Sequence, residues 1–268
     1  MLLQLSAVID KTDQSCYNIP IPLYLRGNIM KITVWNEFVH EKVDDDVKAV
    51  YPDGIHMCLK RFLEAAGHEV RTATLDDPEC GLTDEVLNDT DVLFWWGHVK
   101  HGAVPNEVVD RVARHVYAGM GLVVLHSGHA SKIFGRLCGT PTGDLKWRET
   151  GDKEILWFIE QGHPITRGLG EKIILEHEET YGEHFMIPQP DELVLVSWFS
   201  GGEVFRSGCV FKRGRGKIFY FRPGHETVPT YHNPAVQQLL INAAEYVCTP
   251  KAEEPYAYGW SPVKAIDQ

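Results

Sequence analysis

The hydrophobic pattern divides the chain into strands and helices from Met30 onward. Short apolar runs predict buried strands, whereas apolar residues three or four positions apart predict a helix with one buried face. The predicted strands are KITVW at 31–35, EVRTATL at 69–75, DVLFWW at 91–96 and GLVVL at 121–125, and the predicted helices are 53–66, 83–87 and one that begins at Pro105. Strands that alternate with helices predict a mostly parallel sheet covered by helices on both faces.

The pattern changes after Gly139. Residues 140–170 are interrupted by Gly and Pro, and we expect an irregular insertion there. Strand patterns follow at 173–179, 192–199 and 209–221, and the KRGRGK segment predicts a hairpin turn in the last of them. Asn233 and Pro234 predict the start of a final helix.

The ends of the chain differ from its middle. Residues 1–29 are interpreted as an N-terminal extension, with Met30 a candidate for the true start of the protein, and residues 251–268 as a C-terminal arm. The segment 30–250 is long enough to bury a large core, so we expect one domain there.

Composition excludes several classes of partner. The formal net charge is -11 and the pI is near 5.6, which argues against nucleic acid, because phosphate binding needs clustered Lys and Arg. No run of about 18 apolar residues occurs, so we expect no membrane span. The six cysteines are scattered without a CxxC pair and no signal peptide is apparent, which predicts reduced thiols in a cytoplasmic protein.

Histidines are concentrated after the ends of the predicted strands. In an open parallel sheet, ligands bind outside the carboxyl ends of the strands. The residues that we expect at this edge are Glu37, His40, His56, His98, His101, His126, His129, His225, Glu226 and His232. Their convergence predicts an active site.

Two kinds of chemistry fit this edge. A divalent metal, with zinc the first candidate, would be held by imidazoles from His98, His101, His126 and His225. The alternative is metal-free acid–base catalysis, in which His225 or His126 is the base and Glu226 orients the imidazole. No GxGxxG fingerprint follows a strand, so we do not expect NAD.

Further side chains are candidates for contact with a substrate. Trp96 is a candidate to stack against a sugar ring. In the segment EETYGEH, Glu179, Glu183 and His184 are candidates for carboxylate ligands or sugar contacts.

One segment resembles a known catalytic turn. His126-Ser127-Gly128-His129 follows a strand where class I glutamine amidotransferase-like proteins carry Cys-x-Gly-His, and FYFRPGHE resembles the segment that supplies their catalytic His and Glu. Such a strained turn projects one side chain toward a helix N-terminus. Here His126 replaces the cysteine, and Cys138 lies too far along the chain to substitute for it, so we expect no thiol chemistry.

Several motifs together resemble the ThuA family of trehalose utilization proteins. They are MKITVWNEFVHEK, YPDGIH, WWGHVKHG, VLHSGHASKIFG, ETYGEHF and FRPGHE, and they extend from Met30 to about Thr249. The resemblance implies a flavodoxin-like, class I glutamine amidotransferase-like three-layer sandwich with a mostly parallel central sheet. It also implies a role in trehalose and disaccharide utilization, with formation or processing of 3-keto sugars beside a separate sugar dehydrogenase.

These observations predict a carbohydrate-active enzyme with a histidine-rich site. We expect catalysis from His126, Ser127, His225 and Glu226, and substrate contacts from Trp96, His129, Glu37, Glu183 and His184. The expected partners are a small-molecule sugar, a separate sugar dehydrogenase and further copies of the chain in a homo-oligomer. The alternative is a non-catalytic sugar-binding or regulatory module on a degenerate amidotransferase fold.

Overall fold

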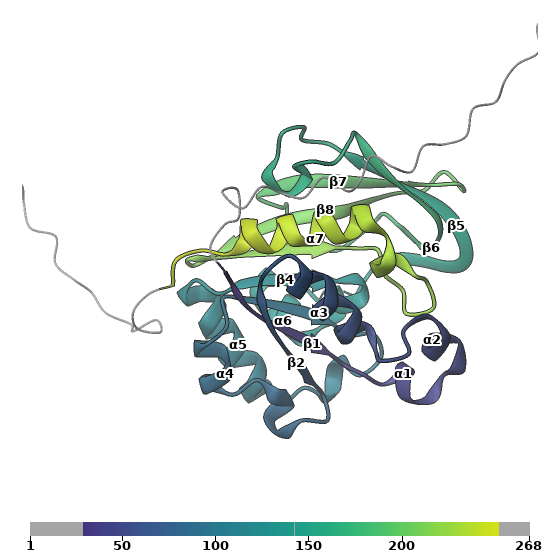
Figure 1. Cartoon of the computed structure of the whole chain (residues 1–268). Helices are drawn as coiled ribbons and strands as arrows, with labels where there is room; N and C mark the ends of the chain where they lie inside the picture. Colours follow the sequence, from purple (N-terminus) through teal and green to yellow (C-terminus); the bar gives the residue numbers. More distant parts are fainter. Residues whose placement is uncertain (1–28, 142, 252–268) are drawn as a thin grey trace, which may run out of the picture.

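The structure of the chain, a computed structural model, describes residues 29–141 and 143–251 (Figure 1). Within these residues nine strands form one sheet in the order β2-β1-β3-β4-β9-β8-β7-β5-β6. The strands are β1 (Lys31–Asn36), β2 (Glu69–Thr74), β3 (Val92–Trp96), β4 (Gly121–Leu125), β5 (Lys146–Phe158), β6 (Lys172–Gly182), β7 (Glu192–Phe199), β8 (Val204–Arg213) and β9 (Gly216–Phe221). The predicted N-terminal extension and C-terminal arm lie outside the described residues, apart from Ile29 and Lys251.

The sheet has a parallel half and an antiparallel half. Strands β2, β1, β3, β4 and β9 pair in parallel, as the alternation of strands and helices predicted. Strands β8, β7, β5 and β6 each run antiparallel to their neighbours. The expectation of a mostly parallel sheet is therefore wrong. The physical reason is that no long helix lies between consecutive strands from β5 to β9, and short connections favour antiparallel neighbours.

The irregular insertion expected at residues 140–170 contains the longest strand of the described structure. β5 extends over 13 residues and pairs with both β6 and β7. The first half of β5 is mostly polar and exposed, so its sequence lacks the apolar alternation that marks a strand. Tertiary pairing, not local pattern, makes this segment a strand.

Helices cover the parallel half. They are α1 (His40–Val43), α2 (Asp45–Val50), α3 (Ile55–Ala65), α4 (Asp84–Asn88), α5 (Asn106–Ala118), α6 (Lys132–Cys138) and α7 (Pro234–Val247). The predicted helices correspond to α3, α4, α5 and α7, and Asn233 caps α7 as expected. Two short helices, α1 and α2, were not predicted, although Asp44 caps α2 by accepting hydrogen bonds from two backbone amides.

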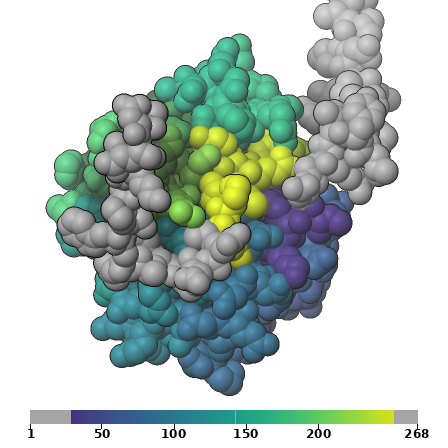
Figure 2. All heavy atoms as spheres, turned by 90° about the vertical axis from the view of Figure 1, so that its left-hand side faces the viewer, coloured from purple at the N-terminus to yellow at the C-terminus, as the bar shows by residue number. Residues whose placement is uncertain are grey.

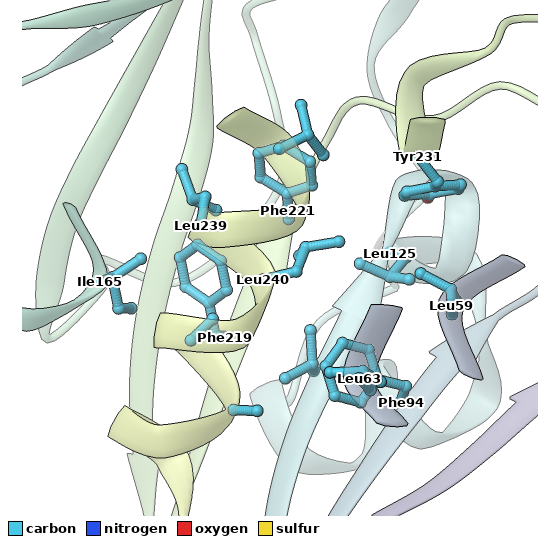
Figure 3. Close-up of a cluster of buried hydrophobic side chains, with 14 of the residues drawn as sticks. Leu59, Leu63, Phe94, Leu125, Ile165, Phe219, Phe221, Tyr231, Leu239 and Leu240 are labelled. Carbon is cyan, nitrogen blue, oxygen red and sulfur yellow. The ribbon is translucent and has the colours of Figure 1, made fainter. Parts of the chain in front are cut away.

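Two apolar cores flank the sheet and give the expected three layers. One core places α3 and α7 against β1, β3, β4 and β9, and Figure 3 shows Leu59 and Leu63 on one side of it and Leu239 and Leu240 on the other. The second core joins α5 and α6 to the opposite face. In Figure 2 the yellow C-terminal segment lies between the blue N-terminal half and the green antiparallel half.

Two expectations from composition concern membrane spans and cysteines. None of the described helices combines the length and apolar character that a membrane crossing requires. The five cysteines in the described part are free. Burial raises the pKa of the Cys138 thiol to about 12, so this side chain is a poor nucleophile.

The predicted KRGRGK hairpin joins β8 to β9 and packs tightly against α5. Arg213 pairs with Gly216, and Gly214 has a φ of +60° in the turn. A Cβ atom on Gly216 would lie 2.2 Å from the carbonyl oxygen of Val116 and 2.9 Å from that of Met120. This glycine lets the β9 backbone approach the end of α5 closely.

We predict that Gly216→Ala destabilises the fold by about 1–3 kcal/mol or more, because the added methyl group overlaps fixed backbone atoms. Urea unfolding monitored by tryptophan fluorescence measures the loss. Gly170→Ala is the matched control, because a Cβ there meets nothing within 4 Å. Equal unfolding midpoints for the two variants would contradict the prediction.

A buried ion cluster joins the two halves of the sheet. Arg222, directly after β9, has no exposed surface and hydrogen-bonds the Glu154 carboxylate of β5. Its Nη1 donates to the carbonyl oxygen of Glu179 at 2.6 Å and lies 3.4 Å from Oε2 of Glu178. Because β8 and β7 lie between β9 and β5 in the sheet, these contacts require the antiparallel half to curl toward the end of β9.

We predict that Arg222→Met costs about 3–5 kcal/mol of unfolding free energy, because it leaves two buried carboxylates without their cation. The control is Arg167→Ala, which breaks an ion pair with Glu245 on the surface and should cost at most about 1 kcal/mol. Chemical denaturation of both variants tests the difference. A cost for Arg222→Met as small as that of the control would show that the cluster does not hold the halves together.

Candidate functional site

Three histidines and one glutamate converge at the carboxyl ends of the parallel strands. His98 follows β3, His126 follows β4, and His225 and Glu226 follow β9. One potential ligand atom from each of these four residues lies within 4.8 Å of all the others. The imidazole centroids are 5.3–5.7 Å apart. The structure thus brings together side chains that the sequence placed at one edge, and we call them the histidine cluster.

His126 forms the base of the cluster. It is fully buried and has a φ of +50°, the strained conformation of an elbow between strand and helix. Its Nδ1 lies 3.0 Å from the carbonyl oxygen of Arg222, and because a carbonyl only accepts, Nδ1 carries the proton. Nε2 therefore presents a lone pair to the cluster. Burial, reinforced by the charge of His98, lowers the pKa of His126 to about 3, so the ring is neutral.

Glu226 divides its two oxygens between different partners. Oε1 accepts hydrogen bonds from Nδ1 of His98, at 2.8 Å, and from Nδ1 of His40. Oε2 is buried without a hydrogen-bond partner. Burial opposes ionisation of Glu226, but the hydrogen bond and charge of His98 outweigh it and hold the pKa of the carboxyl well below its usual range. The cluster thus contains one firmly ionised carboxylate.

His98 and His225 experience opposite environments. Burial alone would lower the pKa of His98, but the hydrogen bond and charge of Glu226 reverse the effect and raise it. Burial lowers the pKa of His225. Nδ1 of His225 lies 2.8 Å from Oγ1 of Thr227, which leaves Nε2 facing Glu226 at 3.7 Å from its Oε2.

Two side chains of β6 complete the floor of the site. Oε2 of Glu179 lies 3.2 Å from Nε2 of His126, but neither atom forms a hydrogen bond. Burial raises the pKa of Glu179. The Tyr181 ring stacks on the His126 ring at a centroid distance of 5.5 Å. Only the curled antiparallel half brings these residues here, so their positions could not be derived from a parallel sheet.

Glu37 supports the loop that carries His98. Its carboxylate accepts hydrogen bonds at 2.8–3.0 Å from the backbone amides of His98, Val99 and Lys100. Glu37 is 1% exposed, and its oxygens are occupied by the loop. Sequence analysis assigned Glu37 to substrate contact, whereas the structure shows it holding the loop after β3.

Three other predicted residues lie outside the histidine cluster. Oγ of Ser127 donates to the carbonyl oxygen of Gly97 at 3.1 Å. His129 is buried in a ring of aromatic side chains that includes Tyr181 and Phe185. His101 follows His98 by three residues, but it is not among the four convergent side chains. Burial lowers the pKa of His101.

The three remaining predicted substrate contacts have different surroundings. Trp96 is 1% exposed and its Nε1 donates to the carbonyl oxygen of Gly224 at 3.1 Å, so neither ring face is open to a sugar. Glu183 forms a two-point ion pair with Arg206. His184 is exposed.

The histidine cluster has the donors that a divalent cation prefers. Three imidazoles and a carboxylate are a donor set typical of zinc. Metal-ligating histidines usually donate their second ring N–H to a carbonyl or carboxylate, as His126 does to Arg222 and His98 does to Glu226. Buried Nε2 of His126 and Oε2 of Glu226 lack hydrogen bonds, and a bound cation would satisfy both.

Comparison with solved structures places the chain among ThuA-like folds. A ThuA-like protein of Parabacteroides merdae has 18% sequence identity and a TM-score of 0.62, with 86% of this chain and 94% of that chain covered. A ThuA-like protein of Bacteroides uniformis has 16% identity and a TM-score of 0.58, with 83% and 92% covered. A cytoplasmic protein of Salmonella typhimurium has 13% identity and a TM-score of 0.57, with 82% and 100% covered.

Comparison with sequence families identifies the chain more directly. No curated protein sequence matches it. The family model ThuA, described as trehalose utilisation, matches residues 31–247. This range includes every strand and helix of the described structure. The chain therefore belongs to the ThuA family.

Proposed function

We propose that the chain is a sugar-active enzyme that binds a divalent cation, zinc first, at the histidine cluster. The observation that carries the proposal is the convergence of four ligand atoms within 4.8 Å. Two of the residues, His126 and Glu226, also hold buried atoms without hydrogen bonds. Leaving buried polar atoms unpaired costs about 1–3 kcal/mol each, which a ligand at the site would recover.

The protonation states of the cluster suit a cation. His126 is neutral and directs its Nε2 lone pair inward, because its Nδ1 proton faces the Arg222 carbonyl. Glu226 is ionised and provides one negative charge. A cation would also satisfy the requirement that a buried carboxylate be paired.

A bound cation supplies Lewis-acid polarisation of a sugar oxygen or a water of lowered pKa. The protein itself contributes Glu179 as a proton carrier. The pKa of Glu179 is raised, so this carboxyl exchanges protons nearer to neutral pH than an ordinary glutamate does. Oε2 of Glu179 lies 3.2 Å from Nε2 of His126, so it is adjacent to the cluster. We assign Glu179 the transfer of a proton to or from the sugar.

The proposed substrate is a disaccharide of the trehalose type or its 3-keto derivative. Support comes from the description of the family, trehalose utilisation, and from the acid–base groups at the site, since proton abstraction beside a keto group suits 3-keto sugars. In this proposal a separate sugar dehydrogenase supplies the keto sugar in the cytoplasm.

Metal-free acid–base catalysis is a second candidate, favoured by the ion pair between Glu226 and His98. The raised pKa of His98 keeps this ring protonated closer to neutral pH, so it is suited to act as an acid. The geometry differs from the sequence-based scheme in one respect. Glu226 hydrogen-bonds His98 and His40, whereas its Oε2 is 3.7 Å from His225, so the carboxylate orients a different imidazole.

We predict that the purified protein retains stoichiometric zinc and that His225→Ala and Glu226→Gln each weaken zinc binding by about tenfold or more, because each removes a ligand. Metal analysis after dialysis and calorimetric titration of the stripped protein measure the effect. His177→Ala is the matched control, since this exposed histidine on β6 lies outside the cluster. Active protein without bound metal would reject the zinc site and support the metal-free scheme.

We predict that Glu179→Gln lowers kcat on a 3-keto disaccharide by about a hundredfold or more while zinc content stays unchanged, because the amide keeps the shape of the side chain but cannot exchange a proton with the sugar. Rates are followed by NMR of the sugar. Glu176→Gln, an exposed residue of the same strand, serves as the control. Binding of trehalose without turnover in the wild type would instead indicate the non-catalytic sugar-binding module.

A further inference from the structure

An exposed tryptophan lies on the strand that borders the histidine cluster. Trp147 of β5 is 63% exposed, whereas Trp157 and Trp198 are 38% and 39% exposed. A single exposed aromatic ring is ordinary on a protein surface, so the position of Trp147 relative to the cluster decides whether it has a role. Neither the fold nor the proposed chemistry accounts for this exposure.

Strand pairing places Trp147 on the face that carries the cluster. Trp147 is directly opposite Tyr181 in the antiparallel pair of β5 and β6. Opposed residues of such a pair project from the same face, with Cβ atoms about 5 Å apart. The Tyr181 ring is stacked on His126 at 5.5 Å. Trp147 is therefore separated from the base of the cluster by one aromatic side chain.

Glu149 gives an independent link between β5 and the cluster. Its Oε1 lies 3.9 Å from Nε2 of His225. Glu149 is two residues after Trp147, in the irregular stretch of β5 between Arg148 and Asp152, and its contact with His225 places its carboxylate beside the cluster. Glu149 is exposed and no closer ion pair or hydrogen bond holds its carboxylate among the described residues. It is free to accept hydrogen bonds from a ligand.

A surface pocket of about 430 Å³ adjoins the same tryptophan. Trp147 lines it together with Arg148, Glu183 and Glu203. Its volume lies within the range of small-molecule sites, about 300–1,000 Å³. The pocket also contains Arg148 and Thr180, which alternate with Trp147 and Tyr181 and therefore project from the opposite face of the β5–β6 pair. Trp147 thus lies at the boundary between this pocket and the face that carries Tyr181.

The chemistry of this surface matches a neutral sugar. A pyranose ring presents a C–H face that packs on an indole, while its hydroxyl groups donate to carboxylates. The carboxylates beside the cluster, Glu149 and Glu179, disfavour an anionic ligand such as a sugar phosphate there.

We propose that Trp147 and Glu149 form a pyranose subsite, in which Trp147 stacks against the second ring of a neutral disaccharide while the first ring lies beside the histidine cluster. The identification of the ligand as a sugar rests on the proposed function. The subsite gives the exposed ring of Trp147 a role.

The test compares Trp147→Ala, Trp147→Phe and Trp157→Ala. We expect Trp147→Ala to weaken trehalose binding by about tenfold, because it removes one stacking face, and Trp147→Phe to retain most of the affinity. Trp157→Ala is the matched control, an exposed tryptophan at the far end of the same strand, and should bind trehalose as the wild type does. Isothermal titration calorimetry measures binding, with methyl α-glucoside as a single-ring probe that should respond little to Trp147→Ala.

The outcomes separate this inference from the metal proposal. Zinc content is measured in every variant and should not change, because Trp147 is not a ligand. Unchanged trehalose affinity in Trp147→Ala, no trehalose binding by the zinc-loaded wild type, or tighter binding of trehalose 6-phosphate than of trehalose would overturn the subsite. Trehalose binding that depends on Trp147 in a protein without bound metal would support the subsite and reject the metal site.

Discussion

The site depends on one buried cation, Arg222. Its guanidinium group bonds carboxylates of β5 and β6, strands that lie beyond β8 and β7 in the sheet. Its own carbonyl oxygen accepts the Nδ1 proton of His126. One residue therefore holds the antiparallel half against the parallel half and also fixes the tautomer of the central histidine. Buried charges persist only when their partners are complete, which ties folding of the second half to formation of the site.

The elbow at His126 has the backbone geometry of a nucleophile turn but not its nucleophile. The backbone retains the positive φ of a nucleophile turn, yet the side chain is an imidazole that burial keeps neutral. An imidazole at this position accepts a proton or a cation through Nε2, whereas a thiolate would attack a carbonyl carbon. The surrounding His98 and His225 support the proposed use of this turn in metal coordination.

The parallel half and the histidine cluster were accessible from sequence because both depend on local pattern. Apolar runs located β1, β3 and β4, and the rule for carboxyl ends of parallel strands then brought His98, His126 and His225 to one edge. The positions of Glu179 and Tyr181 could not be predicted. They depend on how the antiparallel half curls toward β9, and long-range strand pairing, not local sequence pattern, determines that curl. For the same reason sequence offered the buried Trp96 as a stacking surface, while Trp147 lay in a segment expected to be irregular.

Glu226 carries a consequence for motion near the site. The same oxygen that receives His98 also receives His40, the first residue of α1, so two segments 58 residues apart are tethered to one atom. A ligand that shifts this carboxylate would therefore also change its hydrogen bond to α1. The position of the short helix α1 is thereby coupled to occupancy of the histidine cluster.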